Sequence, residues 1–355
     1  MPNDNLAQPE GPSAYPQQPP GAGREAATLE LRDVTKVYPD QQRPALSHLN
    51  LKVDAGQVCV LVGPSGSGKT TAMRLINRMI PLSRGDILIG GRSVLERDPV
   101  ELRREIGYVI QQIGLFPHLS VNENIATVPR LLGWDRARIA TRVRELLELT
   151  GLQAEIGKRY PAQLSGGQRQ RVGVARALAG DPPVLLMDEP FGAIDPINRN
   201  RLQDEFLRLQ HRLRKTVVFV THDIDEAIKL GDRIAILREG GTLAQYDTPA
   251  EILTEPTDQF VAEFVGADRA LKRLGLETLA GVELIEVDGI DVGDRHVPVT
   301  TTVRDALSHI LAAGGAPLAV VDGEETVGAV TLELLGGLLG DGALRGTESR
   351  ERAAR

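Results

Sequence analysis

The sequence predicts an α/β fold in which helices cover both faces of a largely parallel sheet. Three short runs, Val58–Val62, Val184–Met187 and Val217–Val220, are continuously apolar, and such runs are typical of central strands that are buried on both faces. The first run leads into a glycine-rich turn and then into a helical pattern, an order that is typical of α/β domains. With 355 residues, of which 41% are hydrophobic, the chain is long enough for about two domains.

The N-terminal part divides into a tail and an antiparallel β subdomain. Residues 1–27 are rich in Pro, Gln and Gly and poor in apolar side chains, which predicts a disordered tail. The segments Leu29–Val34 and Leu49–Val53 alternate apolar and polar residues, as half-exposed antiparallel strands do. The main domain, of which these strands form one edge, is predicted to span residues 28–265.

A helical subdomain is predicted inside the main domain, at about residues 98–180. It contains the segment Arg136–Leu149, in which apolar residues recur at helical spacing: Ile139, Val143, Leu146 and Leu147. The first two central strands are therefore separated by an inserted helical unit.

A small α+β domain is predicted to follow at residues 266–340. A helix is expected from Thr302 to Leu307, followed by strands at Leu318–Asp322 and Val327–Val330 with a turn between them. The polar residues 341–355 are expected to form a flexible tail.

Composition excludes several functional classes. The formal net charge of -7 argues against nucleic-acid binding, because phosphate backbones are bound by clustered Lys and Arg. No apolar stretch approaches the roughly 18 to 20 residues of a membrane span, and the N-terminus lacks the pattern of a signal peptide. Cys59, the single cysteine, stands among apolar residues and is expected to be an unreactive strand residue. The chain is thus expected in the cytosol unless a partner holds it at a membrane.

A phosphate-binding loop lies between the first central strand and the helix after it. Its backbone N–H groups can cradle phosphate oxygens, and the N-terminus of the helix adds the positive end of its dipole. Lys69 is expected to bridge the β- and γ-phosphates of a nucleotide, and the Thr70 hydroxyl to bind Mg²⁺. The residues expected to bind the nucleotide here are Gly63, Pro64, Ser65, Gly66, Ser67, Gly68, Lys69, Thr70 and Thr71.

Two carboxylates follow the second apolar run. Asp188 stands at the strand end, where it can hold Mg²⁺ through water, and Glu189 is the candidate general base for attack on the γ-phosphate. Taken alone, such a pair is more often a solvated strand end, but the phosphate loop in the same chain favours the catalytic interpretation.

A second anion site is predicted at Leu164–Gln168. Ser165 is placed to cap a helix that begins near Gly167, and a helix N-terminus attracts phosphate. The residues assigned to this turn are Ser165, Gly166, Gly167 and Gln168.

The phosphate loop, the Leu-Ser-Gly-Gly-Gln turn and the Asp-Glu pair occur in an order that resembles the ATP-binding subunit of an ABC transporter, over Leu29–Phe264. The resemblance implies a P-loop NTPase cassette that hydrolyses ATP with Mg²⁺. It also implies a head-to-tail homodimer, in which Ser165 and Gly167 of one copy complete the γ-phosphate site of the other.

The same resemblance assigns roles to four single residues. Tyr38 is similar to the aromatic residue that stacks on adenine, and Gln111 to the glutamine that joins Mg²⁺ and the attacking water to the helical subdomain. His222 resembles the switch histidine that contacts the γ-phosphate. Asp195 matches the loop that crosses the dimer, where Ile194 replaces a more usual leucine.

Two segments, Ile106–His118 and Met187–Ile197, are similar to the ATPases of importers for osmoprotectants such as glycine betaine, choline and carnitine. This implies a position on the cytoplasmic face of a bacterial membrane, bound to permease subunits and served by an extracytoplasmic solute-binding protein. Because a quaternary ammonium ion is usually bound by several aromatic rings and aromatics make up 3% of this chain, the solute is expected to be recognised by those other subunits. Residues Leu115–Pro117 are expected either to dock the permease or to pack inside the helical subdomain.

The C-terminal pattern over Thr302–Leu335 resembles one CBS motif, a regulatory unit that occurs in pairs. A regulatory nucleotide could then bind only through pairing with the dimer mate or with the poorly matching Val282–Val299 region.

Three alternative functions stay open: an importer ATPase for amino acids or another small solute, a soluble ABC ATPase outside transport, and a nucleotide-sensing module with little turnover.

Overall fold

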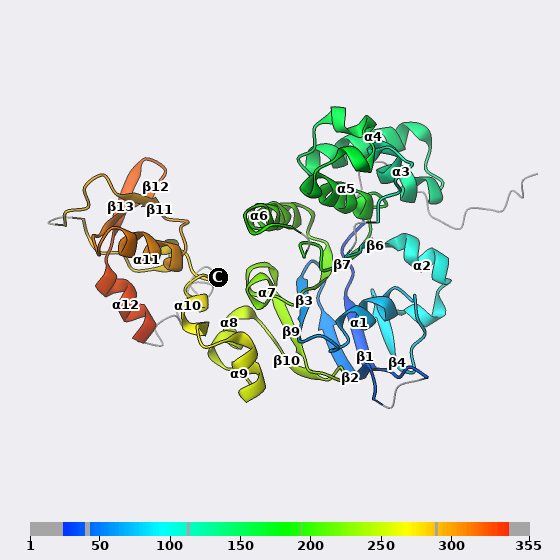
Figure 1. Cartoon of the computed structure of the whole chain (residues 1–355), viewed down its shortest axis with the longest axis horizontal. Coiled ribbons are helices and arrows are strands. Elements are labelled where there is room, and N and C mark those ends of the chain that lie inside the picture. Colours follow the sequence, from blue (N-terminus) through cyan, green and yellow to red (C-terminus); the bar gives the residue numbers. More distant parts are fainter. Residues whose placement is uncertain (1–23, 40–42, 112–113, 193, 288–289, 341–355) are drawn as a thin grey trace, which may run out of the picture.

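The computed structural model describes residues 24–39, 43–111, 114–192, 194–287 and 290–340 (Figure 1). Its centre is a six-stranded sheet with the strand order β10-β9-β3-β8-β7-β6. Five strands are parallel and β10 pairs antiparallel with β9. The strands are β3 (Val58–Val62), β6 (Ile106–Val109), β7 (Val184–Asp188), β8 (Thr216–Val220), β9 (Arg233–Leu237) and β10 (Leu243–Asp247).

The three apolar runs of the sequence form the adjacent strands β3, β8 and β7, as predicted. Every residue of these strands is buried, because each face of the sheet packs against its own hydrophobic cluster. Parallel pairing brings the carboxyl ends of neighbouring strands to one edge of the sheet, where ligands bind in α/β folds.

One face of this sheet is covered by helix α1 (Lys69–Ile76) and by an antiparallel sheet in the order β2-β1-β4-β5. This confirms the predicted antiparallel strands, with β1 at Leu29–Lys36 and β2 at Leu46–Val53. The two remaining strands are β4 (Arg84–Ile89) and β5 (Arg92–Ser93). Cys59 is fully buried on this face, as expected.

The other face packs against helices from two parts of the chain. Helix α6 (Pro196–Leu213) and helix α7 (Ile224–Leu230) follow the central strands β7 and β8. Three helices, α3 (Val121–Leu131), α4 (Arg136–Leu149) and α5 (Gly166–Leu178), form a separate group at the top right of Figure 1.

The helical subdomain is smaller than the predicted range of about 98–180. Strand β6 lies inside that range but pairs with β7 in the central sheet, and α2 (Pro99–Glu105) directly precedes it. A run of only four residues, Ile106–Val109, carries too little apolar pattern to be separated from neighbouring helices by periodicity. As a consequence Gln111 lies two residues after a strand of the central sheet.

The predicted N-terminal tail also extends too far, because residues 24–27 are attached to the core. The Arg24 N–H donates to the Asp181 carboxylate, and the Thr216 hydroxyl donates to the Ala27 carbonyl over 2.7 Å. Lys215 is only 4% exposed, and its ammonium pairs with Asp181 at 2.8 Å and donates to the Arg24 carbonyl. A buried ammonium requires such partners, which the sequence pattern does not reveal. Residues 1–23 and 341–355 of the predicted tails lie outside the described residues.

The C-terminal part begins with three short helices, α8 (Pro249–Thr254), α9 (Gln259–Val265) and α10 (Arg269–Arg273). A three-stranded sheet follows, with β11 (His296–Pro298) parallel to β12 (Leu318–Asp322) and β13 (Glu325–Val330) antiparallel to it. Helices α11 (Val303–Ala312) and α12 (Leu332–Gly340) complete a unit with its own hydrophobic cluster. The predicted helix, strand, turn, strand pattern is confirmed, while the Val282–Val299 region supplies β11 to the same small sheet.

Two properties of the described residues concern membranes and metals. No helix among them combines the length and apolarity that a membrane crossing needs. Nor do they contain a group of three or more His, Cys, Asp or Glu residues able to hold a metal ion without other ligands.

Candidate functional site

The phosphate loop joins β3 to α1, as the sequence predicts. Gly63, Gly66 and Gly68 all have positive φ angles, and a Cβ atom on Gly63 or Gly68 would lie 2.2 Å from the carbonyl oxygen of Leu237 or Ala45. Only glycine fits these two positions. No side chain caps α1, so its first N–H groups stay available to an anion.

Lys69 is 8% exposed and its ammonium lies inside the loop. It donates to the carbonyl oxygens of Gly63 at 2.8 Å and Pro64 at 2.9 Å, and to the Ser67 hydroxyl at 3.2 Å. Burial lowers the pKa of Lys69, an effect that the charges of Glu189 and Asp188 oppose. A cation held by neutral acceptors in a phosphate loop is suited to receive an anionic ligand.

Thr70 and Asp188 form an oxygen pair beside this lysine. The Thr70 hydroxyl donates to Asp188 Oδ1 over 3.3 Å, and Asp188 is 6% exposed. Burial raises the pKa of Asp188, which the Thr70 hydrogen bond partly offsets. A buried carboxylate next to a hydroxyl fits a hard divalent cation, since both donors are oxygens and the cation would compensate the buried charge.

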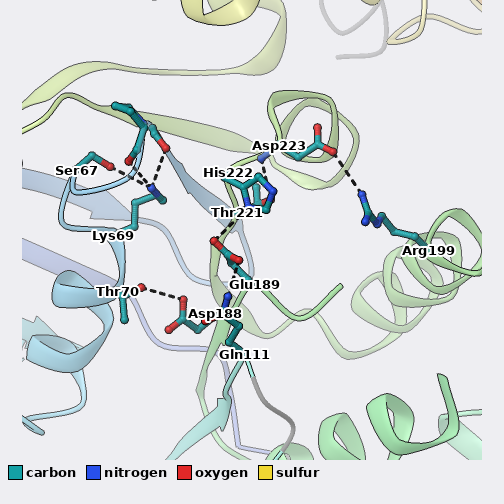
Figure 2. A network of polar contacts seen from close by, with 12 residues as sticks. Ser67, Lys69, Thr70, Gln111, Asp188, Glu189, Arg199, Thr221, His222 and Asp223 are labelled. Carbon is teal, nitrogen blue, oxygen red and sulfur yellow. Dashed lines mark hydrogen bonds and ion pairs between the residues drawn. The ribbon is translucent and has the colours of Figure 1, made fainter. Parts of the chain in front are cut away.

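Glu189, which follows β7, contacts one side chain that follows β6 and one that follows β8, as Figure 2 shows. Its Oε2 accepts a hydrogen bond of 2.8 Å from Gln111 Nε2, and its Oε1 lies 3.2 Å from His222 Nδ1. Because β6, β7 and β8 are neighbours in the sheet, residues that are 78 and 33 positions away from Glu189 in the sequence meet at one carboxylate. Gln111, Glu189 and His222 therefore form one polar cluster.

The backbone of Glu189 is in the left-handed region, with φ of 44°. Its N–H donates to the Val220 carbonyl over 2.9 Å, which holds the end of β7 against the end of β8. Non-glycine residues with such angles are concentrated at functional sites.

A further polar link, which motif reasoning from the sequence did not find, lies next to this cluster. Arg199 on α6 donates to the Ile194 carbonyl over 3.2 Å and lies 3.8 Å from an Asp223 carboxylate oxygen. The only sequence signal for Asp223 is that it follows His222 and precedes a helical pattern. Nothing in the local sequence indicates that Arg199 would reach it.

Asp195 caps the N-terminus of α6. Its carboxylate accepts hydrogen bonds from the Asn198 backbone N–H at 3.1 Å and the Asn198 amide at 2.8 Å. The cap fixes the side chain of Asp195 at the start of α6, and the proposed contact of Asp195 across a dimer stays a prediction.

The turn at Ser165 has the predicted capping role. Ser165 Oγ accepts from the Gln168 N–H at 3.2 Å, and the Gln168 side chain accepts from the Ser165 N–H at 3.0 Å. The helix begins at Gly166, one residue before the expected position. Among the described residues, no hydrogen bond or ion pair joins this turn to the phosphate loop of the same chain.

Two other predicted positions have local contacts. The Tyr38 ring centroid lies 5.0 Å from the Lys36 ammonium, and its adenine contact stays a prediction. Of the segment Leu115–Pro117, Leu115 packs against the core, whereas Phe116 is 41% exposed. The Arg176 guanidinium lies 5.9 Å from the Phe116 ring, so this segment combines internal packing with an exposed surface.

Comparison with known proteins identifies the family to which this geometry belongs. Residues 46–192 match the family described as ABC transporter. The osmoprotectant import ATP-binding protein OsmV of Salmonella typhimurium is 54% identical over 284 residues, which are 79% of this chain and 72% of that protein. The glycine betaine uptake system ATP-binding protein YehX of Escherichia coli is 46% identical over 297 residues, 83% of this chain and 94% of that protein. The chain belongs to the ABC transporter ATP-binding proteins.

Another relative and a solved structure agree with this assignment. The choline transport ATP-binding protein OpuBA of Bacillus subtilis is 50% identical over 283 residues, 80% of this chain and 71% of that protein. The dimeric ATP-binding cassette MJ0796, solved with ADP and phosphate after hydrolysis, is 34% identical with a TM-score of 0.56 and covers 62% of this chain and 98% of that one. The P-loop cassette fold is thereby confirmed, and the chain is an ATP-binding, ATP-hydrolysing transport subunit.

Proposed function

We propose that the chain hydrolyses ATP to drive import of quaternary-amine osmoprotectants, such as glycine betaine, choline or carnitine. The observation that carries the hydrolytic part is the meeting of Gln111, Glu189 and His222 beside the phosphate loop. The solute class is supported by the relatives, whose names refer to osmoprotectant, choline and glycine betaine transport at 46% to 54% identity.

The phosphate loop and α1 bind the triphosphate in this proposal. Lys69 contributes a positive charge at the β- and γ-phosphates, and the backbone N–H groups of the loop bind their oxygens. Thr70 and Asp188 would hold Mg²⁺, with Gln111 as a third ligand. When bound, Mg²⁺ neutralises charge that develops on the phosphate oxygens.

Glu189 acts as the general base. Its carboxylate accepts a proton from the attacking water, and Gln111 orients that carboxylate through its amide, at 2.8 Å in the structure. His222 contacts the other carboxylate oxygen at 3.2 Å and is placed to respond to the γ-phosphate. The held geometry lowers the entropic cost of bringing water, base and phosphate together.

A homodimer completes the site. The Ser165 turn, with Gly166, Gly167 and Gln168, presents the N-terminus of α5, and within the part of the chain that the structure describes no hydrogen bond joins it to its own phosphate loop. We place it against the γ-phosphate bound to a second copy, where its N–H groups add anion contacts. Tyr38 would stack on adenine, and Asp195 would lie at the contact between the copies.

The transporter requires further partners. We place the dimer on the cytoplasmic face of the membrane, against permease subunits that receive solute from an extracytoplasmic binding protein. The exposed Phe116 belongs to the surface proposed for the permease. The C-terminal domain, residues 266–340, is proposed to regulate transport. A regulatory nucleotide would bind there through pairing with the dimer mate or with the Val282–Val299 region.

Replacing Glu189 with glutamine tests the hydrolytic proposal. The variant keeps the size of the side chain but cannot accept the proton, so steady-state hydrolysis should fall by about 10²- to 10⁴-fold while ATP-dependent dimers persist. Glu239→Gln, at a site outside the polar cluster, is the matched control. Undiminished turnover in the Glu189 variant would rule out its role as base.

Reconstitution with the permease and its binding protein tests the solute class. Glycine betaine, choline and carnitine should each be compared with a panel of amino acids for stimulation of ATP hydrolysis. Stimulation by an amino acid without stimulation by any quaternary amine would replace the proposed solute and leave the hydrolytic assignment intact.

A further inference from the structure

A cavity of about 370 Å³ lies between helices α5 and α6, beside the end of strand β7. Such a volume is typical of sites for small molecules. Met187 and Pro190, which flank the two carboxylates of the proposed ATPase site, form part of its wall, together with the end of α4. Among the described residues, none of the phosphate loop and none of the polar cluster at Glu189 lines this cavity. It is therefore separate from the proposed nucleotide site.

Apolar side chains from three elements form one wall of the cavity. Val174 comes from α5, Phe191 from the turn after β7, and Leu202, Phe206 and Leu209 from α6. The Phe191 and Phe206 rings meet edge to face, with their centroids 6.5 Å apart. Water gains little at such a surface, because the surface offers it no hydrogen bonds. This wall therefore favours a ligand with an apolar body.

The cavity also contains two buried hydrogen-bond donors that lack an acceptor. Gln170 is 2% exposed, and its Nε2 has no partner among the described residues. The Nε of Arg171 is buried and has no partner among them either. Both residues line the cavity. Because a buried donor without an acceptor costs free energy, a ligand that places oxygen atoms here would satisfy both groups.

The Arg171 guanidinium is already held in position. Its Nη1 donates to the Gly151 carbonyl over 3.1 Å, and its Nη2 donates to Glu205 Oε1 over 2.6 Å. These contacts come from the turn after α4 and from α6, so the direction of the free Nε–H is fixed before a ligand arrives. Such preorganisation lowers the entropic cost of binding.

The charges around the cavity favour an anion over a cation. Arg208 and Arg212 lie one turn apart on α6, both are exposed, and within the described part of the chain neither belongs to an ion pair. Glu205 is already shared by Arg171 and Arg201, at 2.6 and 3.2 Å. The lining as a whole has three guanidinium groups and two carboxylates, the second being that of Glu148. The excess positive charge attracts an acidic ligand.

We propose that this cavity binds a small apolar monocarboxylate. Its hydrocarbon body packs against Phe191 and Phe206, and its carboxylate oxygens accept hydrogen bonds from Gln170 Nε2 and Arg171 Nε. The positive charges of Arg208 and Arg212 favour the anion. A ligand in this position contacts α5 and α6 at once and so joins the helical subdomain to the central sheet domain.

Titration of the nucleotide-free protein, followed by ligand-observed NMR, tests the proposal. The probes are 1-naphthoate, a compact ring acid, and decanoate, a chain of the kind released from lipids. At least one should bind with a Kd of roughly 0.1 mM, and the tighter of the two identifies the source. The neutral analogue 1-naphthalenemethanol should bind about tenfold more weakly than 1-naphthoate, and choline should not bind.

Two variants connect this binding to the cavity. Gln170→Leu keeps the size of the side chain and removes one donor, so the Kd of the bound acid should rise roughly tenfold. Its midpoint of unfolding in urea should not fall, because the lost Nε2 donates to no group among the described residues. Val174→Phe places a ring inside the cavity and should raise the Kd at least about tenfold.

Val100→Phe is the matched control for the added ring. Val100 lies on α2, is 50% exposed and does not line the cavity, so its Kd should stay within about twofold of the wild type. The proposal is overturned if neither acid binds below about 1 mM, or if Gln170→Leu leaves the Kd unchanged. A lower urea midpoint for Gln170→Leu would also overturn it, by showing that the amide already has a partner. Because the titration contains no nucleotide, its outcome is independent of the hydrolytic proposal.

Discussion

Substituting Lys69 by methionine should separate ligand binding from folding at the phosphate loop. In the free protein the ammonium has two carbonyl oxygens and one hydroxyl as partners, at 2.8 to 3.2 Å, and burial already lowers its pKa. Methionine has a similar length and no charge, so it removes both the hydrogen bonds and the cost of burying the ammonium. The free energy of unfolding should therefore change by less than about 1 kcal/mol.

The effect on triphosphate binding should be much larger. Two unit charges about 4 Å apart at an effective dielectric constant of about 20 attract by roughly 4 kcal/mol. Lys69 gives up hydrogen bonds to neutral acceptors when it turns to a phosphate, which offsets about 1.5 kcal/mol of this attraction. The remaining ~2.5 kcal/mol corresponds to a Kd about 70-fold weaker.

Equilibrium titration with a fluorescent ATP analogue and Mg²⁺ measures this change, with urea unfolding of the free protein alongside. Arg130→Met is the control, because Arg130 is exposed on α3, in the helical subdomain. A Kd within threefold of the wild type for Lys69→Met would refute the placement of the γ-phosphate beside this ammonium. A large loss of stability would refute the claim that the charge serves the ligand more than the fold.

Three other predictions concern the core, the capped turn and the thiol. Phe219→Ala should lower the free energy of unfolding, measured in urea, by about 3 to 5 kcal/mol. Phe219 is fully buried, and its ring centroid lies 5.8 Å from that of Phe191 and 6.1 Å from that of Phe206. A loss below about 1 kcal/mol would contradict this packing. Ser165→Ala should cost about 1 kcal/mol by removing a helix cap, whereas Ser165→Asn should keep it, and equal thermal midpoints for the alanine variant and wild type would argue against the cap. Burial raises the pKa of Cys59 to about 12, so a thiol reagent at about pH 8 should label only the unfolded protein; rapid labelling of the folded protein would show that the strand is accessible.

The central part of the fold is predictable from short-range pattern. The strands β3, β7 and β8 are continuous apolar runs, and their identity follows from the burial of both sheet faces. The helix cap at Ser165 is also local, since all of its contacts lie within three residues. Features that are set by residues close together in the sequence can therefore be predicted from the sequence.

Features that depend on tertiary contacts are recovered only in part. Gln111, Glu189 and His222 can be assigned to one site by family resemblance, but their meeting at one carboxylate follows from the order of β6, β7 and β8 in the sheet. The contact of Arg199 with Asp223 and the attachment of Arg24 to Asp181 join residues far apart in the sequence. No periodicity of the chain encodes such pairs, so the local sequence does not predict them.

The backbone angle of Glu189 has a consequence for protein engineering. A φ of 44° costs an L-amino acid about 1 to 2 kcal/mol, and glycine adopts this angle without that cost. A variant with glycine in place of Glu189 would lose both this backbone strain and the carboxylate that is proposed as the base. Directed evolution that rewards heat tolerance or expression alone would thus enrich inert molecules, and a library built on this scaffold needs a turnover readout in every round.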